Sequence, residues 1–156
     1  MKTYNIMSID EFKKNIGTKS RLLGIDPGKK NIGLAICDEN KTDATPFKTL
    51  IKNKFESLYK DIDKIIQENE IKGIVIGNPI NMDGSLGNSA QSTMDFAKNL
   101  SKNITTPITL WDERLSSEGA FKMTKDLNTN VTSQIKNLDK NSAAFILQGA
   151  IDYLTN

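Results

Sequence analysis

The sequence predicts an α/β fold in which antiparallel hairpin strands and parallel strands form one mixed central sheet flanked by helices. Two observations predict it. A pair of short apolar runs joined by a turn-rich segment begins near residue 21, and strand-like runs then alternate with amphipathic helical segments. The length of 156 residues suits one domain of about 100 to 200 residues. We therefore expect one domain at residues 21–156, preceded by an N-terminal extension at residues 1–20.

The N-terminal extension carries the pattern of a short helix. Ser8 and Glu11 have the spacing of a capping box, Phe12 and Ile16 lie on one helical face, and Gly17 is a typical stop. We expect this helix to pack on the body of the protein. No run approaches the roughly 20 apolar residues of a membrane span, and no targeting segment is visible. These features predict a cytoplasmic protein without a membrane partner.

The first half of the main domain reads as a hairpin, a third strand and a helix. Apolar runs at 22–25 and 32–37 flank a turn-rich segment at 26–31. A further strand is expected near 45–51. Apolar residues then recur every three or four positions between 55 and 66, which predicts an amphipathic helix over the sheet.

The second half continues the alternation. Residues 73–77 form a β-branched apolar run before Asn78-Pro79, as expected of a buried parallel strand that ends in a loop. Beyond it we expect a helix at about 90–100, a strand at 108–111, a helix from about 116, a polar loop at 126–137 and a last helix that begins near Asp139.

Two absences in the composition restrict the chemistry. The chain has no His, which removes imidazole general bases and His-containing zinc sites. A lone Cys37 removes disulfide frameworks and thiolate cages. A bound metal must therefore be held by oxygen, and carboxylates prefer hard cations such as Mg²⁺ or Mn²⁺.

Three acidic positions stand at the places where α/β sheets build their sites. Asp26 follows the first strand, Asp112-Glu113 follows the strand at 108–111, and Asp139 shares the apolar stripe of the last helix with Ala143 and Leu147. Three converging carboxylates can hold two divalent ions for phosphodiester hydrolysis. The alternatives are a turn residue at Asp26, a helix N-cap at Asp139 and a surface ion-pair group at 112–114.

Four sequence blocks resemble the YqgF/RuvX family. They are LGIDPGKKNIGLA from Leu23, IVIGNPINMDGS from Ile74, WDERLSS from Trp111, and Leu138-Asp139 with AAFILQ from Ala143. The blocks come in family order and cover nearly everything from residue 21 onward. The resemblance implies an RNase H-like fold related to the Holliday-junction resolvase RuvC. It also implies a cytoplasmic nuclease that trims the 5′ end of the 16S ribosomal RNA precursor.

The family's acidic residues fall by position on Asp26, Glu113 and Asp139. The residues alone leave open whether Asp112 or Glu113 faces the metal, and the resemblance favours Glu113. Phosphate contacts are expected from Lys29, Lys30 and Arg114. The chain departs from the family pattern at Asn78, where relatives usually have an apolar residue, and in a less basic loop before Asp139.

The resulting functional prediction is a two-metal-ion nuclease that acts on structured RNA during ribosome biogenesis, with pre-ribosomal particles as a candidate partner. Two alternatives stay open. One is a Holliday-junction resolvase-like endonuclease acting on branched DNA, and the other is a non-catalytic RNA-binding assembly factor. Either a monomer or a homodimer is compatible with the sequence.

Overall fold

The computed structural model describes residues 5–52, 55–79, 87–113 and 131–155, and within these ranges the side chains of 55, 88, 89 and 131–140 are not described. The strands are β1 (Ile6–Met7), β2 (Arg21–Pro27), β3 (Asn31–Cys37), β4 (Ala44–Ile51), β5 (Ile71–Asn78) and β6 (Ile108–Asp112). The helices are α1 (Ile9–Ile16), α2 (Phe55–Glu68), α3 (Asn88–Asn103) and α5 (Val131–Thr155).

The described strands form one mixed sheet in the order β1-β6-β5-β2-β3-β4. β1, β6, β5 and β2 run parallel to one another, whereas β3 and β4 add antiparallel strands beyond β2. The prediction of a mixed sheet of hairpin and parallel strands is confirmed. Because parallel strands end at the same sheet edge, β2, β5 and β6 bring the residues that follow them together.

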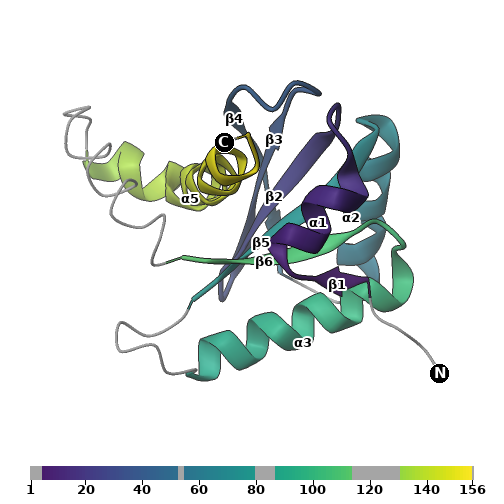
Figure 1. The fold of residues 1–156 in the computed structure, drawn as a ribbon. Coiled ribbons are helices and arrows are strands. Elements are labelled where there is room, and N and C mark those ends of the chain that lie inside the picture. The colour runs from purple at the N-terminus through teal and green to yellow at the C-terminus, as the bar shows by residue number, and fades with distance from the viewer. Residues whose placement is uncertain (1–4, 53–54, 80–86, 114–130, 156) are drawn as a thin grey trace.

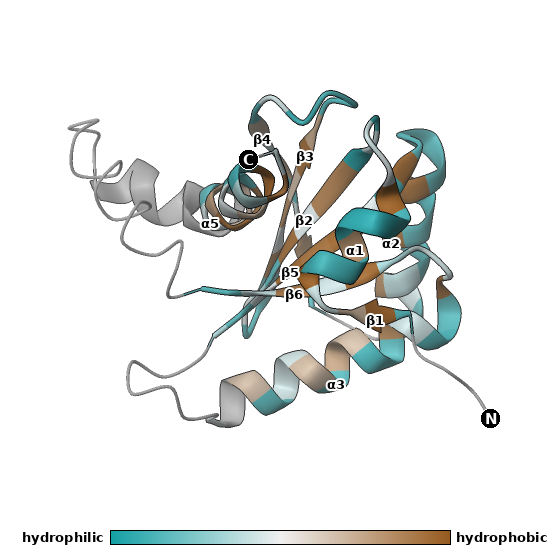
Figure 2. Cartoon of the chain, viewed as in Figure 1, coloured by the Kyte–Doolittle hydropathy of each residue, from teal (hydrophilic) through white to brown (hydrophobic). Residues whose placement is uncertain are grey.

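Helices cover both faces of the sheet (Figure 1). One core cluster joins α2 and α3 to one face, with Leu58, Ile62 and Leu100 packed on Ile25 and Ile76. The other joins α1 and α5 to the opposite face. Figure 2 shows the hydrophobic residues concentrated in the strands and in the inward sides of the helices. None of the helices in the described part of the chain is both long and apolar enough to span a membrane.

The N-terminal extension is built into the sheet. Ser8 caps α1, accepting a hydrogen bond from the Glu11 backbone N–H at 3.3 Å, so the predicted capping position is confirmed. Phe12 is fully buried and Ile16 is 7% exposed in the core that α1 shares with α5. The two-residue strand β1 pairs with β6, and the sequence analysis did not predict it.

The last helix begins earlier than predicted. α5 starts at Val131, so the prediction of a loop at 126–137 is wrong for 131–137, while 126–130 and the helix predicted from about 116 lie outside the described residues. No Gly or Pro interrupts the segment from Val131 to Gln148. Its first turns are polar and show no clear apolar stripe, so the sequence pattern predicted a loop there instead of a helix. Asp139 is therefore inside the helix, which excludes its interpretation as an N-cap.

α5 packs directly on the backbone of β2. A Cβ atom on Gly24 would lie 2.7 Å from Leu147 Cβ and 3.0 Å from the Ala143 carbonyl oxygen. We therefore expect Gly24→Ala to lower the free energy of unfolding by about 1–3 kcal/mol, because the helix must move away from the sheet. Urea unfolding measures this change. An unaltered midpoint would contradict the close packing of α5 on β2.

Candidate active site at the end of the parallel strands

The candidate site lies at the sheet edge where β2, β5 and β6 end. Asp26 is the sixth residue of β2, and Glu113 follows directly after β6. The β2–β5 register pairs Ile25 with Ile76, so Asp26 stands beside Gly77, and Gly77 in turn pairs with Trp111 of β6. Three adjacent strands thus place Asp26, Gly77 and Glu113 close to one another.

The side chains of Asp26 and Glu113 are joined by a hydrogen bond. Both residues are half-buried. Side chains alternate between the faces of a strand. Gly24 meets α5, so Asp26 two residues later faces the same way. Trp111 belongs to the core under α5, which gives Glu113 that same face and Asp112 the opposite one. Of the two adjacent acids, Glu113 is therefore the one that meets Asp26.

Gly77 provides the space for this pair. A Cβ atom there would lie 2.8 Å from Glu113 Oε1 and 3.2 Å from Glu113 Cγ, and it would also meet Ile146 of α5. Real Cβ atoms do not approach other atoms as closely as 2.8 Å, so any larger residue would displace the carboxyl. The sequence analysis did not single out Gly77. Its position at the end of a β-branched run, just before Asn78-Pro79, was the available signal.

Burial raises the pKa of the Glu113 carboxyl above its ordinary value. The hydrogen bond with Asp26 lowers that pKa, and the negative charge of Asp112 raises it. The net direction is upward because desolvation penalises the charged form most. A hydrogen bond between two carboxyl groups also requires a proton on one of them. A cation held by the two carboxyl groups would favour their charged forms.

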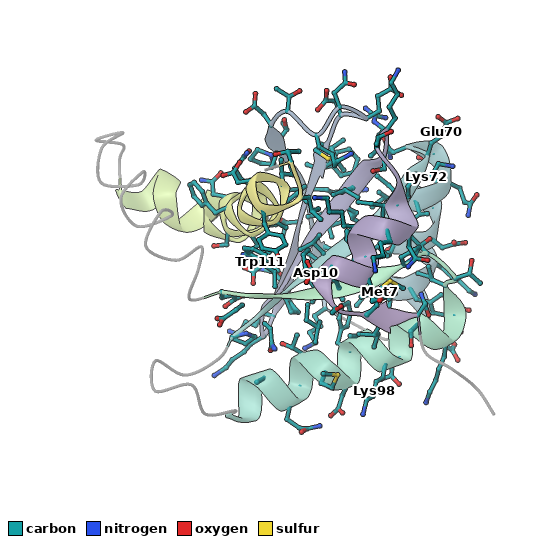
Figure 3. All side chains as sticks on the ribbon, viewed as in Figure 1. Met7, Asp10, Glu70, Lys72, Lys98 and Trp111 are labelled. Carbon is teal, nitrogen blue, oxygen red and sulfur yellow. The ribbon has the colours of Figure 1, made fainter. Side chains whose placement is uncertain are left out.

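Backbone and aromatic contacts fix the end of β6. The Glu113 N–H donates to the Asn78 carbonyl oxygen at 3.0 Å. Trp111 is 8% exposed and packs at a tilt against Tyr153 of α5, with ring centroids 6.1 Å apart. The Tyr153 hydroxyl donates to Asp10 Oδ1 of α1 at 2.9 Å. Figure 3 shows Trp111 below α5 and Asp10 nearby on α1. The strand that carries Glu113 is thus held by both helices of this face.

Asn78 departs from the apolar pattern at this edge, as the sequence indicated. Its Oδ1 atom is buried and has no hydrogen-bond partner among the described residues, an arrangement that costs free energy in a folded protein. By strand alternation its side chain shares the face of Asp112 rather than that of Glu113, because the register pairs Asn78 with Asp112. The departure therefore lies beside the acid pair, on the other side of the sheet.

The other predicted site residues are less fully described. Asp139 lies in α5 one turn before Ala143, which packs over Gly24, but its side chain is outside the described residues. Among the described side chains, no three His, Cys, Asp or Glu residues form a group that could hold a metal. Lys29 and Lys30 are exposed in the turn after β2. Arg114 lies outside the described residues.

Sequence comparison identifies the family. The family model of RuvX, described as a Holliday junction resolvase, matches residues 20–153. The chain belongs to this family. A relative from Pelagibacter ubique named "Putative pre-16S rRNA nuclease" is 52% identical, covering 97% of this chain and all of the relative. One of the same name from Ruegeria pomeroyi is 42% identical over 96% of this chain and 97% of its own length.

Solved structures support the fold. RuvC from T. thermophilus in complex with a Holliday junction substrate matches with a TM-score of 0.57 at 9% identity, covering 87% of this chain and 96% of that chain. The yeast mitochondrial Holliday junction resolvase matches with a TM-score of 0.53 at 14% identity, covering 94% and 84%. The predicted RNase H-like fold and the prediction of a nuclease, a hydrolase of phosphodiester bonds, are confirmed at the level of the family.

Proposed function

We propose that this protein is a metal-dependent nuclease that processes the 5′ end of the 16S ribosomal RNA precursor. The observation that carries the proposal is the hydrogen-bonded pair of Asp26 and Glu113 at the end of adjacent parallel strands. The relatives that align along nearly the whole chain and are named as pre-16S rRNA nucleases supply the substrate. We also propose that the protein acts in the cytoplasm and that pre-ribosomal particles are among its partners.

The chemistry of the site suits a hard divalent cation. Two carboxyl groups meet over a glycine, and all the ligand atoms that they offer are oxygen. We assign Asp26, Glu113 and Asp139 as the residues that would hold Mg²⁺ or Mn²⁺. When bound, such ions supply an activated water and stabilise the leaving oxygen. The residues themselves fix the position of the charge, and the lack of a Cβ at Gly77 leaves space for the Glu113 carboxyl.

Positive side chains beside the pair would position the substrate. Lys29 and Lys30 follow Asp26 within four residues and are exposed, so each can reach a phosphate of a bound strand. Arg114 follows Glu113 directly in the sequence and is assigned the same role.

Residues 1–20 and 21–156 remain our proposed division of the chain, although β1 and α1 share the sheet and core of the main domain.

The second candidate is a resolvase that cuts branched DNA, because the matching family model is described as a Holliday junction resolvase. Such an enzyme would act as a homodimer to cut two strands, whereas an RNA-trimming enzyme can act as a monomer. A non-catalytic RNA-binding assembly factor would use the same basic residues and leave the acid pair idle.

One cleavage assay separates these candidates. We expect the wild-type protein to cut a 16S precursor RNA with its 5′ leader in Mg²⁺ or Mn²⁺ but not in EDTA, and to leave a four-way DNA junction intact. Asp139→Ala should lose the RNA cleavage. Cleavage of the junction instead would favour the resolvase. RNA binding with no cleavage in either metal would favour the assembly factor.

A further inference from the structure

Beyond the acid pair, the same sheet edge carries a group of exposed residues in the turn between β2 and β3 and at the end of β4. β2 ends at Pro27, β3 begins at Asn31 and β4 ends at Ile51, so all three chain segments meet at this edge. The Lys52 N–H donates to the Lys30 carbonyl oxygen at 2.8 Å, which fixes the two lysines side by side. We name Lys29, Lys30, Ile51 and Lys52 the β3–β4 rim.

The rim lies within reach of a strand bound at the acid pair. The registers align Asp26 with Gly33 of β3 and Gly33 with Thr49 of β4. Neighbouring strands are about 4.8 Å apart, so Thr49 lies about 10 Å from Asp26 across the sheet. Ile51 is two residues beyond Thr49 and shares its face, which is also the face of Asp26. A polymer held at Asp26 can therefore continue onto the rim.

The charge of this surface suits a polyanion. Residues 27–37 and 44–52 contain four Lys, at positions 29, 30, 48 and 52, and no Asp or Glu. All four lysines are exposed. The acids of the connecting loop, Asp38, Glu39 and Asp43, lie at the other end of the β3–β4 hairpin. Within these two segments the rim end therefore carries positive charge and no acid, which favours a phosphate backbone.

Exposed apolar side chains accompany these charges. Ile51 is 70% exposed and Phe47 is 39% exposed. Phe47 stands at an irregularity of β4, since Pro46 pairs with Ala35 and Lys48 pairs with Leu34, and such bulges re-aim a side chain. Surfaces that combine cations with apolar or aromatic side chains bind nucleic acid by packing against base faces, which only unpaired nucleotides offer.

A protein strand is a less suitable occupant of this edge. β4 is an edge strand, and an added strand would need its outward hydrogen-bonding groups. Pro46 has no N–H to donate, and Lys48 places a charge in the middle of the strand. Both are devices that discourage edge-to-edge pairing. The exposed Ile51 is therefore better matched to a base than to a second protein strand.

We propose that the β3–β4 rim binds unpaired nucleotides next to the bond that is cut, with Lys30 and Lys52 on phosphates and Ile51 against a base. The inference rests on the proposed function, because it takes the acid pair as the cleavage site. It specifies the substrate further: a single-stranded segment extends from the site across β3 and β4.

Binding measured by fluorescence anisotropy in EDTA tests the rim without any cleavage. The probes are an RNA duplex with an unpaired extension of about six nucleotides and the same duplex with a blunt end. We expect Lys30→Ala/Lys52→Ala to weaken binding of the extended probe by about tenfold and to reduce its salt slope by about 1.4, the value for two phosphate contacts on a single strand. Ile51→Ser should weaken binding of the extended probe alone.

The matched control is Lys19→Ala/Lys72→Ala. Both lysines are exposed at the opposite edge of the sheet: Lys19 precedes β2, and Lys72 lies at the start of β5. Figure 3 shows Lys72 at that far end. Equal losses from both double variants, or equal losses on the two probes, would overturn the proposal. So would a change of oligomeric state in Ile51→Ser by sedimentation, which would assign the edge to a second copy. Rim-dependent binding without cleavage in Mg²⁺ would reject the nuclease instead.

Discussion

Asp26→Asn is expected to lower metal-dependent RNA cleavage by about 10³-fold or more while leaving the protein folded. Asp26 is the central acid of the site: it stands on β2, next to the strand that carries Gly77, and shares a hydrogen bond with Glu113. An amide keeps the size of the side chain and removes its charge. The loss should therefore appear in the chemical step, because cation binding at the pair needs the negative oxygen.

Single-turnover cleavage of the precursor RNA, at saturating enzyme, measures this loss free of binding effects. Asp61→Asn is the matched control, since Asp61 lies on α2 and is exposed. It makes the same chemical change away from the acid pair and should leave the rate constant unaltered. Thermal unfolding should give similar midpoints for both variants. Cleavage by Asp26→Asn at the wild-type rate would refute the assignment of this acid pair.

The elements that the sequence predicts well are those with strong local patterns. The hairpin from Arg21 to Cys37 and the strand Ile71–Asn78 follow apolar runs bounded by turn residues. β1 escaped prediction because a strand of two residues has no periodicity and exists only through its pairing with β6. The start of α5 escaped because its first turns lack a clear apolar stripe, so that only the absence of breakers indicated helix.

The site shows the same division between local and distant information. The rule that sites gather at the ends of parallel strands selects Asp26 and the adjacent acids Asp112-Glu113 from the sequence. The choice between those two acids depends on which face of β6 meets α5. The structure supplies that through Trp111, which lies in the core under α5 and so gives Glu113 its direction. The role of Gly77 depends in turn on the register of β5 with β6. Neither register can be read from local spacing.

Stability without metal should depend on pH through Glu113. Its folded pKa is raised above the unfolded value, chiefly by burial, so the folded state binds the proton more tightly than the unfolded chain does. This contribution to stability is complete below the unfolded pKa, and it is lost as the pH rises through the folded pKa. Glu113→Gln cannot ionise and should keep its stability over that range.

We therefore expect the unfolding temperature of Glu113→Gln in EDTA to exceed that of the wild-type protein increasingly as pH rises from 4 to 8. Each unit by which the folded pKa exceeds the unfolded one is worth about 1.4 kcal/mol, or about 3–5 °C for a domain of this size. Adding Mg²⁺ should close the gap by stabilising the wild-type protein alone, because the variant lacks the charge that favours the cation. A constant difference across this pH range would mean that Glu113 is not held in a desolvating environment.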